Sequence, residues 1–114
     1  MRFHILGVPH TITRPEYSTC AFTQKVLKLC KMLADRGHDV IHYGNEASVV
    51  AGEHVTVTTL DDLDRSYPGH DWLTQGFPAF DAANDPIYRE FYANTISAIH
   101  RRRRRGDFLL CPFG

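Results

Sequence analysis

The chain has 114 residues, of which 43% are hydrophobic and 23% charged, so it is long enough and apolar enough to bury one core. We expect a single domain over residues 1–114. Thirteen basic and thirteen acidic side chains cancel, which excludes a global electrostatic attraction to nucleic acid or to an anionic membrane.

The cysteines and the N-terminal residues indicate in which cellular compartment the protein is expected. Cys20, Cys30 and Cys111 are odd in number and widely spaced, so they predict neither a disulfide framework nor a zinc site. The apolar run before Pro9 is too short for a signal peptide or a membrane span. We therefore expect a cytoplasmic protein without a membrane span.

The first predicted element is a strand over residues 2–8, because a short run that is apolar on both faces is typical of a buried parallel strand. Residues 9–21 are polar and read as a loop. Ser18 or Thr19 is available there to cap a following helix.

A helix follows this loop and ends at Arg36, with Gly37 just beyond it. Residues 38–43 then form a second strand, and Gly44 permits a turn. The helix is amphipathic. Its predicted buried stripe is Phe22, Val26, Leu29, Cys30 and Leu33.

The middle of the chain contributes a third strand over residues 54–59, where β-branched residues alternate with others. We predict a short helical turn over Leu60–Arg65. The stretch from there to residue 85 is expected to be an ordered loop held by aromatic side chains. These are Trp72, Phe77 and Phe80.

A second long helix begins at Asp85-Pro86, because Asp85 can cap free amides and proline suits the first helical position. We expect it to run to about Arg104, and Gly106 to precede a fourth strand over residues 107–111. Its predicted buried stripe is Ile87, Tyr88, Phe91, Tyr92, Ile96 and Ile99. The fold class is thus α/β: a Rossmann-like, three-layer parallel sheet of about four strands with two long helices.

Ligands of parallel sheets bind beyond the carboxyl ends of the strands. Two loops after predicted strands carry the polar candidates. The candidate ligand-binding residues are Pro9, Thr11, Arg14, Tyr17, Asn45 and Glu46. The loop after strand one also holds His10. A GxGxxG motif and a P-loop are both missing from the sequence, so we expect no nucleotide cofactor held by a glycine loop.

His10 has two interpretations. It sits where a substrate hydroxyl could arrive and can act as a general base. Alternatively, it is an exposed or backbone-bonded loop histidine, since the chain has six others. The residues alone leave both open.

We predict no metal site. His38 and His42 share a strand face but lie about 13 Å apart along it, too far to share an ion. Four acidic residues of the middle region match no EF-hand spacing, so we interpret them as part of a solvated loop. They are Asp61, Asp62, Asp64 and Asp71.

The run Arg101 to Arg105 is the most conspicuous charge feature. Cations are favoured at a helix C-terminus, and aromatic residues do not interleave with these arginines. A solvated helix end is therefore favoured over nucleic-acid binding.

The segment GVPHTITRPEYSTCAFTQKVLKLCKMLADRGHDVIHYGNEAS resembles the opening of a group of bacterial and phage glycosyltransferases of the GT-B type. The later DPIYREFYANTISAIHRRRRRGDFLLC resembles them too. The resemblance implies an N-terminal, acceptor-side domain that receives a sugar acceptor, with His10 in the place where inverting members carry a catalytic base.

Such enzymes continue into a second domain that binds the nucleotide sugar, whereas this sequence ends at Gly114. We therefore expect a glycosyltransferase-like domain that is catalytically incomplete alone. The alternative is a non-enzymatic binding module, phage-encoded or otherwise, that acts through self-association or a host protein. In both cases a homodimer, or a second chain that completes the sheet, is the expected assembly.

Overall fold

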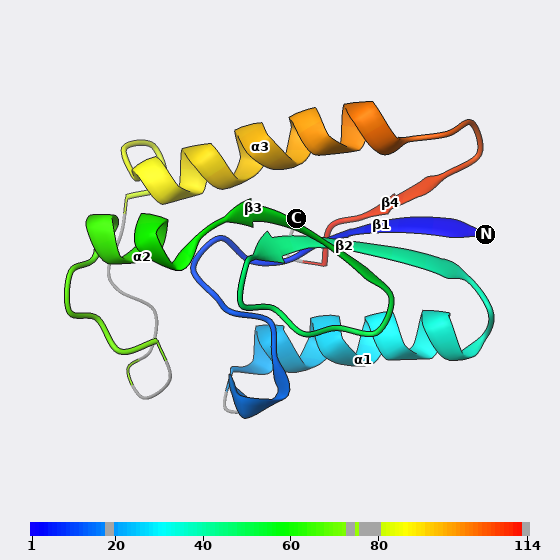
Figure 1. Cartoon of the computed structure of the whole chain (residues 1–114), viewed down its shortest axis with the longest axis horizontal. Helices are drawn as coiled ribbons and strands as arrows, with labels where there is room; N and C mark the ends of the chain where they lie inside the picture. The colour runs from blue at the N-terminus through cyan, green and yellow to red at the C-terminus, as the bar shows by residue number, and fades with distance from the viewer. Residues whose placement is uncertain (18–19, 73–74, 76–80, 113–114) are drawn as a thin grey trace.

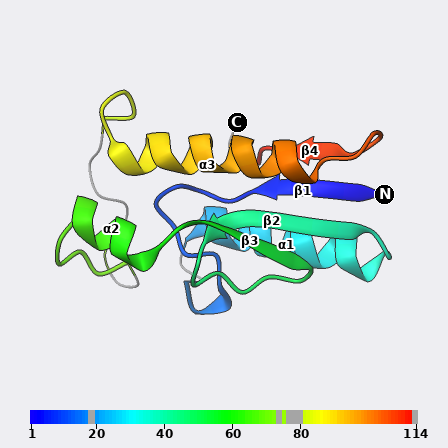
Figure 2. The ribbon, with the colours of Figure 1, turned by 45° about the horizontal axis from the view of Figure 1, so that its top comes forward.

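The computed structural model describes residues 1–17, 20–72, 75 and 81–112. Four parallel strands form one sheet, and α-helices lie on both of its faces (Figures 1 and 2). This arrangement confirms the predicted Rossmann-like α/β fold. The strands are β1 (Arg2–Leu6), β2 (Asp39–Asn45), β3 (Glu53–Thr58) and β4 (Phe108–Leu110). The helices are η1 (Pro15–Tyr17, a 3-10 turn), α1 (Ala21–Asp35), α2 (Leu60–Ser66) and α3 (Pro86–Arg102).

The strand order is β3-β2-β1-β4, so β1 and β2 are central and β4 lies at one edge. β2 runs two residues beyond the predicted end at Tyr43. Gly44 pairs with Thr56 of β3 and does not begin the turn. A Cβ atom at Gly44 would lie 2.6 Å from Cε1 of His42, so the glycine here gives room to a buried ring within the strand.

Helix α1 covers one face of the sheet. The core on this side consists of Ile5, Val26, Cys30, Leu33 and Val40. Three of the five residues in the predicted stripe of α1 are therefore in the core, but Phe22 is 45% exposed. The proposed capping residues Ser18 and Thr19 lie outside the described residues. The described residue before the helix, Cys20, makes no side-chain capping bond.

Helix α3 covers the opposite face, above β2 and β3 (Figure 1). The core on this side consists of Ile41, Tyr43, Val57, Phe91 and Ala98. Ile96 was predicted to be buried but is 56% exposed, because Thr95 and Ala98 face the sheet instead. The helix ends at Arg102, two residues before the predicted position, since Arg103 has an extended backbone.

A third apolar cluster lies at the carboxyl ends of the strands. Ile12, Leu63 and Ile87 meet there, from the loop after β1, from α2 and from the first turn of α3. The helical turn predicted over Leu60–Arg65 is confirmed and extends to Ser66. Phe77 and Phe80 of the predicted aromatic loop lie outside the described residues. This cluster fixes the loop after β1 against the start of α3.

Candidate functional site

His10 lies in the loop that follows β1, at the carboxyl edge of the sheet. Its side chain is buried, with only 3% of the residue exposed. Nε2 of His10 is 2.9 Å from Oδ2 of Asp85, the residue that precedes α3. The interpretation of His10 as an exposed loop histidine is therefore wrong, because the ring is buried against a carboxylate.

Asp85 joins three parts of the fold. Oδ1 accepts the backbone amides of Ile87 and Tyr88, which caps α3 as the sequence predicted. Oδ2 accepts hydrogen bonds from His10 and from the hydroxyl of Tyr67, the residue that follows α2. Each of the two carboxylate oxygens thus accepts two hydrogen bonds.

The electrostatics of this cluster decide which atoms carry protons. Burial raises the pKa of Asp85, but the hydrogen bonds from Tyr67, from the Tyr88 amide and from His10 outweigh burial and lower it. Burial and the neighbouring carboxylate raise the pKa of Tyr67 to about 12. Asp85 is therefore ionised and Tyr67 protonated at neutral pH.

An ionised carboxylate can only accept hydrogen bonds, so Nε2 of His10 must carry the proton in the contact with Asp85. In a neutral ring the lone pair is then on Nδ1. This is the arrangement in which a carboxylate orients a histidine as a general base.

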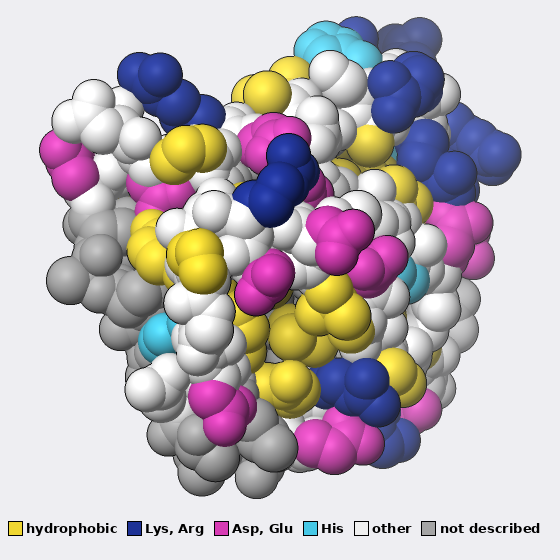
Figure 3. Space-filling model, turned by 60° about the vertical axis from the view of Figure 1, so that its left-hand side comes forward, with side chains coloured by type: hydrophobic (Ala, Val, Ile, Leu, Met, Phe, Trp, Pro, Cys, Tyr) yellow, Lys and Arg dark blue, Asp and Glu magenta, His cyan; other side chains and the backbone are white. Residues whose placement is uncertain are grey.

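A surface pocket of about 470 Å³ opens beside this cluster. Tyr67 and Asp85 line it together with Arg65, Asp81 and Asn84, whereas His10 lies behind Asp85. The ring of Tyr67 also contacts Trp72 edge-on. The view onto this edge in Figure 3 shows apolar side chains flanked by acidic ones. The pocket thus combines charged and amide groups with nearby aromatic rings.

The other candidates in the loop after β1 have varied surroundings. Thr11 is buried and donates its hydroxyl to the Val8 carbonyl at 3.2 Å. Pro9 is buried and Tyr17 packs against the third apolar cluster. The guanidinium of Arg14 pairs with Glu16 at the surface. The side chain of Arg14 is 36% exposed and therefore accessible to solvent.

Asn45 and Glu46 have their hydrogen bonds within the fold. Asn45 is 1% exposed, and its Oδ1 accepts the Ala47 amide while Nδ2 donates to Thr58. Glu46 accepts the Leu60 amide at 2.8 Å, which caps α2. These contacts hold the loop after β2 in place. They also place Glu46 at the same edge of the sheet as α2.

Two histidine contacts in the structure have no signal in the sequence. Nδ1 of His42 lies 3.0 Å from Nδ1 of His54 on the neighbouring strand. Burial first, and then the charge of His54, lower the pKa of His42 to about 3. Among the residues that the structure describes, no group of three or more His, Cys, Asp and Glu side chains is placed to hold a metal ion.

The second missed contact lies on the face that carries α3. His4 of β1 is 1% exposed. Its Nδ1 is 2.7 Å from the Tyr43 hydroxyl and its Nε2 is 2.7 Å from Oδ2 of Asp107. The hydrogen bond with His4 lowers the pKa of Asp107, and burial raises that of Tyr43. His4 therefore donates to Asp107 and accepts from Tyr43.

Comparison of the chain with protein-family models, with curated proteins and with solved structures finds no match. Of the described helices, none has the length and apolar character needed to cross a membrane.

Proposed function

We propose that this chain is an acceptor-side domain for glycosyl transfer, in which His10 removes a proton from the hydroxyl of a sugar acceptor. One observation carries the proposal: a buried His10 whose Nε2 is fixed by the ionised Asp85 at the carboxyl edge of a parallel sheet. The resemblance to GT-B enzymes supports the reaction class, because it puts a catalytic base in the same loop.

In this reaction the acceptor hydroxyl approaches Nδ1 of His10. Its oxygen forms a bond to the anomeric carbon of a nucleotide sugar, and the bond from that carbon to the leaving phosphate breaks. The proton passes to Nδ1, and the ionised Asp85 stabilises the imidazolium that forms. Because the ring is 3% exposed, acceptor binding must open the loop of residues 9–14.

The substitution His10→Gln tests the proposal sharply. A glutamine amide can still donate to Asp85, but it has no basic lone pair to take the acceptor proton. When a second, donor-binding chain completes the enzyme, transfer of labelled sugar from a panel of nucleotide sugars to a panel of sugar acceptors should fall at least about 100-fold. The matched control is His38→Gln, a histidine just before β2 at the end of the sheet opposite Asp85, which should leave transfer unchanged.

Equal turnover by the His10→Gln variant and the parent chain would exclude His10 as the base. Both variants need the same far-ultraviolet circular dichroism as the parent, so that a loss of transfer is not a loss of fold. With a second, donor-binding chain supplied, the parent must also transfer sugar with at least one donor and acceptor pair. Failure across the whole panel under that condition would contradict an acceptor-side domain.

A second candidate is a non-enzymatic module that self-associates or binds a host protein. The observation in its favour is the β4 edge of the sheet, where Phe108 and Leu109 are both about half exposed. In this account the contacts of His10 and Asp85 only hold the carboxyl edge together. This candidate predicts no transfer even when a donor-binding chain is supplied, and binding of the chain to itself or to a host protein instead.

A further inference from the structure

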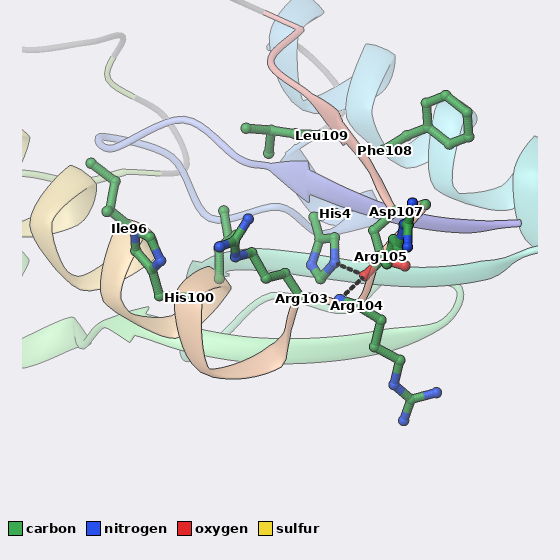
Figure 4. A pocket seen from close by; sticks show the side chains of 11 residues that line it. His4, Ile96, His100, Arg103, Arg104, Arg105, Asp107, Phe108 and Leu109 are labelled. Carbon is green, nitrogen blue, oxygen red and sulfur yellow. Dashed lines mark hydrogen bonds and ion pairs between the residues drawn. The ribbon is translucent and has the colours of Figure 1, made fainter.

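A second pocket lies between α3 and β4, on the sheet face that α3 leaves open above β1. Its volume is about 830 Å³, within the range of small-molecule sites. Figure 4 shows Ile96 and His100 from α3 and Leu109 from β4 directed towards the gap, with Arg103 beside His100. We call this the α3–β4 pocket. Asp85 lies at the opposite end of α3, roughly 25 Å away along the helix.

The apolar part of this pocket is exposed. Ile96 is 56% and Leu109 53% exposed, and Ile99 also lines the pocket. Exposed apolar residues that are scattered singly over a surface are normal, whereas these three line one hollow. A solvated helix end, which the sequence favoured, accounts for the arginines but does not account for these apolar neighbours.

The charged part of the pocket is cationic. The cations are Arg103, Arg104 and Arg105, and the ring of His100 lines the pocket beside them. Arg102 forms an ion pair with Glu53. Among the described residues, the other arginines of the run 101–105 form no ion pair with a carboxylate. Asp107 is already bonded to Arg2, His4 and the Arg104 amide. The remaining guanidinium groups thus have no neutralising partner among the described side chains.

We propose that the α3–β4 pocket binds a single anionic amphiphile, namely an organic phosphate with an apolar body. The phosphate lies against His100 and Arg103, since guanidinium groups bind phosphate oxygens through paired hydrogen bonds. The apolar body covers Ile96, Ile99 and Leu109. This site is independent of the proposed glycosyl transfer and would exist in a purely binding protein as well.

The concave shape favours a single bound molecule over a membrane surface, because the apolar side chains line a hollow. A nucleic acid is disfavoured as well. Single-stranded nucleic acids need aromatic rings on which their bases can stack. Apart from histidines, Phe108 is the only aromatic residue among the described residues of the lining. Its ring points away from the gap in Figure 4.

Dodecyl phosphate below its critical micelle concentration is the probe, and binding is measured by calorimetry and by backbone amide chemical shifts. We expect saturable binding of one molecule, with shifts at residues 96–109. Dodecyltrimethylammonium has the same tail with a cationic head and should not bind. Inorganic phosphate, the head without the tail, should bind at least about tenfold more weakly, since it forgoes burial of the tail.

Three variants locate the site. Arg103→Gln should weaken dodecyl phosphate binding about tenfold, the effect of losing a charged hydrogen bond. Ile96→Ser should weaken it as well and, because Ile96 is largely exposed, should leave the fold intact. Arg101→Gln is the matched control, because it removes one arginine charge from the same run of residues. Arg101 lines a different pocket, beside β3, so this variant should stay within twofold of the parent.

Equal losses in Arg101→Gln and Arg103→Gln would overturn the proposal, because binding would then follow net charge. Amide shifts centred on residues 10 and 85 would overturn it too. Binding to phosphatidic acid vesicles without binding to monomeric dodecyl phosphate would assign this surface to a membrane and also reject the pocket.

Discussion

Asp85 serves two purposes with one carboxylate. Oδ1 caps the first turn of α3, and Oδ2 holds His10 and Tyr67. The sequence predicted the cap, because Asp-Pro at the start of an amphipathic run is a local signal. It could not predict the contact with His10, which is 75 residues away along the chain and has no local signature.

Replacing Asp85 by alanine should lower the free energy of unfolding by about 3 kcal/mol, as the cap is lost and two buried donors lose their acceptor. Urea denaturation at pH 7 measures this. Asp81→Ala, which removes an exposed carboxylate from the same loop, should cost no more than about 1 kcal/mol.

The same Asp85→Ala comparison has a defined pH dependence. The folded pKa of Asp85 is lowered, so its contribution is fully present above the unfolded pKa of about 4 and is lost as pH falls through the folded value. The difference between parent and variant should therefore shrink below about pH 4. A difference that stays constant down to pH 2 would show that Asp85 acts through shape alone.

At the scale of elements, β2 and β3 are joined by a pair of histidines as well as by their backbone. His42 faces the α1 side of the sheet and contacts His54, and both pKa values are lowered, chiefly by burial. A histidine with a lowered folded pKa takes up its proton more readily in the unfolded chain. The pair therefore makes the sheet sensitive to acid.

Unfolding free energy should fall as pH drops below the unfolded histidine pKa of about 6.5, and for His42 the fall continues towards pH 3. The slope is at most about 1.4 kcal/mol per pH unit for each proton. His42→Leu removes one of the two groups and should flatten the profile between pH 6 and pH 4.5, measured by urea denaturation. Parallel profiles for parent and variant would contradict this account.

The elements themselves were largely predictable. Hydrophobic period and local caps placed the four strands and both long helices to within a few residues. The errors have physical causes. Ile96 fits the helical period, but α3 presents Thr95 and Ala98 to the sheet. Gly44 is a common turn residue, but here it relieves a close contact with His42 inside a strand.

At the scale of the whole molecule, the two pockets occupy opposite ends of α3. The carboxyl edge brings together the loop after β1, the end of α2 and the start of α3. The α3–β4 pocket joins the end of α3 to β4. The sequence identified His10 and the arginine run as notable, but their partners depend on how the strands are ordered. The hydrogen bonds of Tyr67 and His4, and the position of Leu109 in the α3–β4 pocket, therefore become visible only in the folded structure.

We propose that Asp85 orients the His10 ring so that Nε2 carries the proton and Nδ1 the lone pair. Long-range proton–nitrogen NMR of the neutral His10 ring tests it directly, since the two nitrogens have distinct shifts in each tautomer. We predict a protonated Nε2 and an unprotonated Nδ1. A protonated Nδ1 with an unprotonated Nε2 would contradict this assignment, because Oδ2 of the ionised Asp85 would lose the His10 donor and keep only Tyr67. The acceptor hydroxyl would then meet no lone pair on Nδ1.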